Sequence, residues 1–168
     1  MSAYRQEKKA ETTLHLREVR CFVPKHYVVK TVQGKKVRTL QPVVSNLVFV
    51  YASWNEMMRL KQTMDYLQFQ TQIIQQKRHV MVVPDDEMEQ FIRVSQQTEA
   101  DICYYRPEEL DTANSQLVRV IGGNFNGMEG RLMKIIGKRQ KRVVLQLDNL
   151  LAMAITIENP EYLELIKS

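Results

Sequence analysis

Residues 118–132 read Val118-Arg119-Val120-Ile121-Gly122-Gly123-Asn124-Phe125-Asn126-Gly127-Met128-Glu129-Gly130-Arg131-Leu132. The alternation of Val118 and Val120 with other residues predicts a strand with one buried face. The glycines at 122, 123 and 127 allow the positive φ that a tight turn requires. Phe125 is expected to lie under this turn as part of the core. Gly130 is expected where the next strand must kink sharply to close a small barrel.

Further short strands are predicted from here to the end of the chain, over residues 132–136, 142–147, 151–157 and 162–165. A basic turn, Gly137-Lys138-Arg139-Gln140, separates the first two of them. Five short strands in about fifty residues are typical of an SH3-like barrel. We expect this barrel to bind partners rather than to catalyse a reaction.

The residues before the barrel predict helices combined with a mostly antiparallel sheet. Helices are expected over residues 4–20, 54–61 and 84–94, with Ser53 capping the second. A hairpin turns at Gly34, and residues 43–51 are apolar enough for a central strand, with further strands at 66–69 and 80–83. The predicted fold class is therefore α+β, with a first domain at 1–98, a linker at 99–115 and the barrel at 116–168.

Charge is distributed unevenly along the 168 residues. Residues 1–50 hold ten Lys and Arg against three Glu, a net charge of +7, whereas residues 51–113 carry −5 and residues 114–168 carry +3. Such asymmetry can steer a protein towards a polyanion, although a solvated charged face explains it as well. Cys21 and Cys103 lie in no CxxC or metal-ligand pattern, and no apolar run approaches the roughly 18 residues of a membrane span. We expect a reduced, cytoplasmic protein with no metal, no cofactor and no membrane partner.

The glycines, Phe125, the Glu129-Gly130 pair and the strands that follow resemble a KOW motif and its domain. The preceding helix, hairpin and Pro42–Val50 segment resemble the N-terminal domain of NusG, whose sheet is ferredoxin-like, so the resemblance covers essentially the whole chain. Four segments are similar to UpxY, the specialised NusG paralogues that act as antiterminators of capsular polysaccharide operons. These are Phe22–Pro24, Gly34–Arg38, Pro42–Val50 and Phe91–Ser95.

The resemblance implies a transcription elongation and antitermination factor that binds RNA polymerase through its N-terminal domain and suppresses pausing and termination. It implies polymerase contacts at Val43, Val44, Leu47 and Phe49. Contacts with non-template DNA or nascent RNA are implied at three basic residues of the first helix, Arg5, Lys8 and Lys9. At the hairpin tip, Lys35, Lys36 and Arg38 are candidates for contact with nucleic acid or with polymerase. The KOW domain would bind another partner, such as a ribosomal protein or a regulator, and no oligomeric state is implied.

Two departures from the family pattern stand out. NusG-like domains begin with a Trp-Tyr-Val type strand just before the first helix, and here Met1 stands where that strand should end. We expect this first strand to be truncated and the natural start to lie upstream. Val43-Val44-Ser45-Asn46 also replaces the more aromatic pattern of housekeeping NusG, which favours a paralogue.

Ordinary structural roles remain open for most of these residues. Alternation along a strand would place Val43, Leu47 and Phe49 on one face and Val44 on the other, and one of these faces is simple core. Solvated surface charge is an alternative for the lysines and arginines. No Ser-His-Asp set, carboxylate pair or phosphate-binding GxxxxGK[ST] loop occurs, so no residue is a candidate for catalysis. Two alternative functions remain, a housekeeping NusG-type factor and a ribosome-associated KOW protein that binds RNA.

Overall fold

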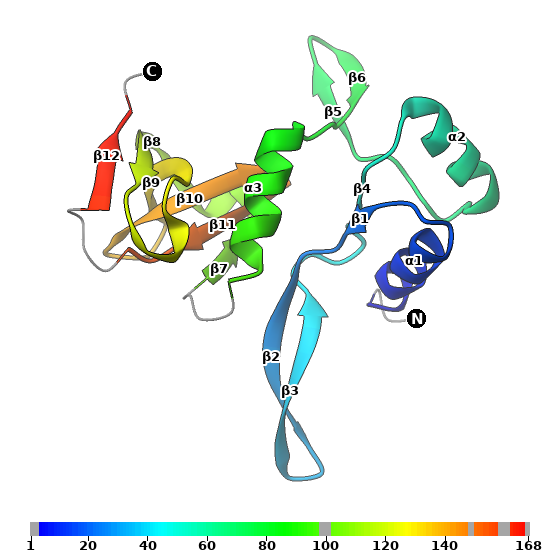
Figure 1. Ribbon diagram of the computed structural model, residues 1–168, viewed down its shortest axis with the longest axis horizontal. Coiled ribbons are helices and arrows are strands. Elements are labelled where there is room, and N and C mark those ends of the chain that lie inside the picture. Colours follow the sequence, from blue (N-terminus) through cyan, green and yellow to red (C-terminus); the bar gives the residue numbers. More distant parts are fainter. Residues whose placement is uncertain (1–3, 98–101, 148–149, 158–161, 167–168) are drawn as a thin grey trace. The chain divides into compact units, whose positions relative to one another are not determined.

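The computed structural model describes residues 4–97, 102–147, 150–157 and 162–166. The chain forms two compact units, Met1–Val82 and Val83–Ser168. Figure 1 shows the elements of each unit in their order along the chain.

The first unit contains two helices and three separate pairs of short antiparallel strands. Strand β1 pairs with β4, β2 with β3, and β5 with β6. Their bounds are α1 Tyr4–Leu16, β1 Cys21–Phe22, β2 Lys25–Val32, β3 Lys35–Pro42, β4 Phe49–Val50, α2 Trp54–Thr63, β5 Thr71–Ile74 and β6 Lys77–Val80.

The second unit is a six-stranded antiparallel sheet with one α-helix, and its strand order is β12-β8-β9-β10-β11-β7. Two short 3-10 turns, η1 Pro107–Glu109 and η2 Gly123–Phe125, precede β8 and β9. The other bounds are α3 Asp85–Ser95, β7 Ile102–Tyr105, β8 Leu110–Val120, β9 Glu129–Ile135, β10 Lys141–Leu147, β11 Leu151–Ile155 and β12 Leu163–Leu165.

The predicted α+β fold class is confirmed, with helices and strands in the N-terminal part followed by a mostly β C-terminal part. The N-terminal strands differ in detail from the single sheet expected of a ferredoxin-like domain. Among residues 4–97 they form only two-stranded pairs.

Helices α1 and α2 pack together through small apolar stripes. Ala10 and Leu14 of α1 lie one turn apart, as do Leu60 and Met64 at the end of α2, and the four form one buried cluster. Ser53 begins α2 as predicted: its hydroxyl accepts from the amide of Glu56, whose carboxylate accepts from the Ser53 amide at 2.8 Å. This capping box satisfies two amides that the first turn leaves without helical partners.

Three predicted strands of the first unit are wrong, and of the last, over residues 80–83, only Val80 belongs to a strand. The segment expected as a central strand over residues 43–51 instead turns directly after β3, and only Phe49–Val50 pairs as β4. Asn46 has a φ of 60°, a left-handed conformation that interrupts an extended chain. Residues 66–69 are also not a strand; the hairpin lies later, at β5 and β6, around a turn in which Gln75 and Gln76 both have positive φ.

Helix α3 belongs to the second unit. Its Phe91 and Val94 are completely or almost completely buried, at 0% and 2% exposure, and the Phe91 ring lies 6.3 Å from that of Tyr104 in β7. The side-chain amide of Gln90 also pairs with the backbone of Glu129 in β9, donating to its carbonyl at 2.7 Å and accepting from its amide at 3.2 Å. The structure therefore places α3 with the sheet, and places β7 and the start of β8 within the segment expected as a linker.

Glycine is required in the sheet at Gly130. A Cβ at this position would lie 2.8 Å from Cγ1 of Val143 and 3.0 Å from the carbonyl oxygen of Val144. Strands β9 and β10 can therefore approach closely here only because residue 130 has no side chain. The predicted core residue of the preceding turn is different: Met128 is fully buried, whereas Phe125 is only partly buried.

We expect Gly130→Ala to destabilise the protein by about 1–3 kcal/mol, because the new methyl overpacks against a backbone carbonyl that cannot move freely. Urea unfolding measures the loss. Val143→Ala should cost less in the Gly130→Ala background than in the wild type, since it removes one of the two clashing atoms. Gly137→Ala is a control, because a Cβ there meets no atom within 4 Å and suffers only from the positive φ of 79°. Strict additivity of Gly130→Ala and Val143→Ala would contradict the close approach.

The burial of Tyr104 predicts that the free energy of unfolding falls in alkaline solution. Burial raises the pKa of its phenol to about 12, above the value of roughly 10 in an unfolded chain. The folded state thus holds this proton more tightly, so its contribution to stability is complete below pH ~10 and is lost as the pH rises towards ~12. The free energy of unfolding should fall more steeply with pH in the wild type than in Tyr104→Phe, and parallel curves would contradict the burial effect.

Candidate nucleic-acid interface

Two glutamates of α1 hold both ends of the β2–β3 hairpin. The Glu11 carboxylate forms an ion pair with Nζ of Lys25, the first residue of β2, at 2.6 and 2.7 Å. The Glu7 carboxylate, one helical turn earlier, accepts a hydrogen bond from the backbone amide of Asn46, four residues beyond the end of β3. The chain is therefore fixed to the helix both where the hairpin begins and shortly after it ends.

The Glu7 carboxylate is an unusual core group. It is only 3% exposed, and its second oxygen has no hydrogen-bond partner among the described residues. A buried charge of this kind is costly unless it is hydrogen-bonded, so the amide of Asn46 is an essential partner. Nearby, burial and the charge of Glu11 raise the pKa of the Cys21 thiol, which keeps it in the unreactive protonated form.

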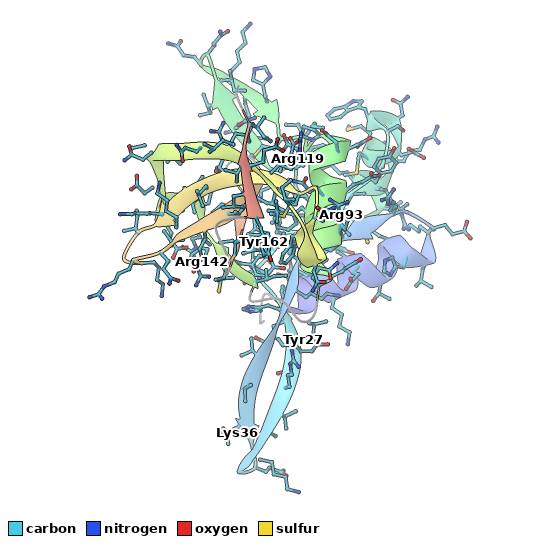
Figure 2. The ribbon with its side chains drawn as sticks, turned by 60° about the vertical axis from the view of Figure 1, so that its left-hand side comes forward. Tyr27, Lys36, Arg93, Arg119, Arg142 and Tyr162 are labelled. Carbon is cyan, nitrogen blue, oxygen red and sulfur yellow. The ribbon has the colours of Figure 1, made fainter. Side chains whose placement is uncertain are left out.

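The hairpin itself presents basic and apolar side chains to solvent. Gln33 and Gly34, with φ of 49° and 77°, form its two-residue turn, the conformation expected of a type I′ turn. The three candidates predicted in this region, Lys35, Lys36 and Arg38, are all exposed. Figure 2 shows Lys36 near the tip of the hairpin and Tyr27 nearer its base.

Sequence reasoning missed Tyr27. The residue is 53% exposed, and the guanidinium carbon of Arg38 lies 3.9 Å from the centroid of its ring. Tyr27 pairs with Leu40 across the hairpin and Val29 pairs with Arg38, so Tyr27 and Arg38 are diagonal neighbours on one face. The signal that could have identified Tyr27 is an aromatic residue within a predicted hairpin that carries several cations and no acidic residue.

The basic candidates on α1 occupy different environments. Lys8 and Lys9 are exposed, and Nζ of Lys9 lies 4.6 Å from the centroid of the Tyr66 ring. Arg5 belongs to α1, but its side chain is outside the described residues. The lysines thus point to solvent while Glu7 and Glu11 of the same helix turn towards the chain that follows.

The four apolar candidates do not form one face, because the segment is not a continuous strand. Leu47 is 5% exposed and belongs to the core. Val43, Val44 and Phe49 are partly exposed, and the Phe49 ring lies 6.5 Å from that of Phe22 in β1. Three of the four predicted residues are therefore available at the surface of the first unit.

The described residues contain no group of three or more His, Cys, Asp or Glu placed to hold a metal ion. None of the described helices is long and apolar enough to span a membrane. A surface hollow of about 420 Å³ lies beside β8 and β9 of the second unit and is lined by Leu110–Ala113 and Lys134–Lys138.

Comparison with known proteins assigns the family. The family model described as transcription termination factor nusG matches residues 1–92, more than half of the chain. A search of curated proteins gave no match. Members of this family are non-enzymatic transcription elongation and antitermination factors that bind RNA polymerase, and the chain belongs to the NusG family.

Proposed function

We propose that this chain is a specialised, cytoplasmic NusG paralogue that suppresses pausing and termination, in the manner of the UpxY antiterminators of polysaccharide operons. Family membership supplies the elongation-factor role and polymerase binding. The specialisation is supported by the similarity of four segments to UpxY and by Val43-Val44-Ser45-Asn46 in place of the housekeeping pattern.

The observation that carries the proposal is the arrangement around α1. Glu7 and Glu11 hold an apolar, partly exposed segment and a basic hairpin beside the same helix. A factor that binds polymerase beside exposed nucleic acid needs an apolar surface for the polymerase and a basic surface for the nucleic acid. We propose that Val43, Val44 and Phe49 contact polymerase, with Leu47 supporting them from the core.

The exposed cations are proposed to contact nucleic acid. Those of the hairpin are Lys35, Lys36 and Arg38, and those of α1 are Lys8 and Lys9, with Arg5 in the same helix. Contacts of this kind with phosphates give affinity that depends on salt and is insensitive to sequence. The non-template DNA strand and nascent RNA are the candidate ligands.

The second unit is proposed to bind a separate partner, a ribosomal protein or a regulator. An RNA-directed role is the alternative, and one observation favours it. Lys134 of β9 and Lys141 of β10 pair directly across the sheet, which places two like charges side by side on the exposed surface. Asp111 of β8 pairs with Lys134 from the other side, and Lys138 and Arg139 add positive charge in the turn.

We expect the double substitution Val43→Asp/Val44→Asp to weaken retention of the full chain by RNA polymerase core at least about tenfold. Two carboxylates would enter an apolar interface without partners, at a cost of more than about 1.4 kcal/mol. Retention on immobilised polymerase measures the effect. Ile136→Asp is the matched control, since Ile136 is 64% exposed in the second unit. Undiminished retention would contradict the proposed surface, and binding to ribosomal particles instead of polymerase would favour the alternative.

Specialisation predicts a restricted set of regulated genes. Deleting the gene should lower the ratio of promoter-distal to promoter-proximal transcripts in polysaccharide biosynthesis operons, and leave most other operons unchanged. Transcript sequencing measures both. A similar change across most operons would show a housekeeping factor instead.

A further inference from the structure

The β2–β3 hairpin carries no acidic residue. Residues 25–42 contain five Lys and Arg and no Asp or Glu. Lys25, at the base, is already paired with Glu11, and the four cations beyond it, Lys30, Lys35, Lys36 and Arg38, are exposed. An exposed element whose charged residues are all positive attracts a polyanion, so charge complementarity identifies a nucleic acid as its ligand.

The hairpin also has a feature that phosphate binding does not require. The guanidinium carbon of Arg38 lies 3.9 Å from the centroid of the exposed Tyr27 ring, which brings two planar groups together on one face of the hairpin. Cross-strand pairing places Lys36 on the same face, two residues from Arg38 along β3, which is about 6.8 Å in an antiparallel strand. A planar platform thus lies directly beside a cation.

Planar side chains next to cations suit single strands rather than duplexes. An unpaired base can stack on an aromatic ring or on the plane of a guanidinium, while its phosphate lies against a nearby lysine. The bases of a duplex already stack on one another, so a duplex offers this surface little besides its phosphates. The platform should therefore add affinity only for unpaired nucleotides.

We propose that Tyr27 and Arg38 form a stacking site for an unpaired base of single-stranded nucleic acid, with Lys36 binding the adjoining phosphate. This rests on the nucleic-acid part of the proposed function and names the form of nucleic acid that the hairpin takes. Non-template DNA and nascent RNA share this chemistry, and they differ in their sugar.

The test measures binding of the full-length protein, without polymerase, to fluorescent oligonucleotides of about 12 units, a length within the range of known single-strand sites. The probes are oligothymidylate, oligouridylate and a DNA duplex of the same length. Tyr27→Leu, which keeps an apolar side chain but removes the ring, should weaken binding of the single strands about 5- to 100-fold. It should leave duplex binding within about twofold, and Tyr27→Phe should retain single-strand binding.

Two further variants separate stacking from charge. Lys36→Gln should weaken binding to all three probes and reduce the salt slope for single strands by about 0.7. Tyr51→Leu is the matched control: Tyr51 is also exposed, at 60%, with Arg20 5.3 Å from its ring, but it lies outside the hairpin. It should bind single strands as the wild type does.

Tighter binding of the thymidylate or of the uridylate supports the stacking site and assigns its ligand to DNA or to RNA. Equal affinity for the thymidylate and the uridylate supports a stacking site that does not distinguish deoxyribose from ribose. Wild-type affinity of Tyr27→Leu for both single strands, or equal losses for single strands and duplex, would overturn the proposal. Polymerase retention of Tyr27→Leu should be unchanged, so failure of the stacking site and failure of the polymerase surface are distinguishable.

Discussion

The arrangement of the first unit depends on two carboxylates spaced one turn apart on α1. Glu11 pairs with Lys25 where the hairpin begins, and Glu7 accepts from the Asn46 amide after it ends. Because residues four apart share one face of a helix, both acids turn towards the hairpin base together. Lys8 and Lys9 are then left on the exposed surface of the same helix. The spacing therefore removes negative charge from the surface and leaves positive charge on it.

The two contacts are not equivalent energetically. The Glu11–Lys25 pair is partly exposed, at 23% and 30%, and pairs of this kind usually contribute little to stability. Glu7 is buried, so its hydrogen bond to Asn46 compensates the removal of a charge from water. A buried group that must be paired tolerates few alternative geometries. We infer that Glu7 specifies the path of the chain after β3, including the left-handed residue at Asn46, more than it adds to stability.

The sequence predicted the elements whose signals are local. Ser53 identified the start of α2, Gly34 the hairpin turn, and the glycines after Val120 the turn between β8 and β9. The strand expected over residues 43–51 was wrong, because its apolar pattern is equally compatible with a turn stabilised by a distant carboxylate. Glu7, which accepts the hydrogen bond from Asn46, lies 39 residues away in the sequence. Helix α3 was recognised, but its partner was not, because the Phe91–Tyr104 and Gln90–Glu129 contacts are tertiary. Tyr27 was missed for a similar reason: its diagonal contact with Arg38 depends on the register of the hairpin.

The hairpin combines a fixed base with a tip that has few constraints of its own. A two-stranded hairpin is only marginally stable by itself in water, and here Val29, Val32 and Val37 are all at least 40% exposed. The base is held by α1, whereas the tip is held by its own ladder and by a turn in which Gln33 adopts an unfavourable positive φ. Rigidity should therefore decrease from Tyr27 towards Lys36. The Tyr27–Arg38 pair near the rigid base can orient a nucleotide base, while the flexible lysines at the tip can follow a phosphate backbone of variable path. This division suits a factor that moves along nucleic acid of changing sequence.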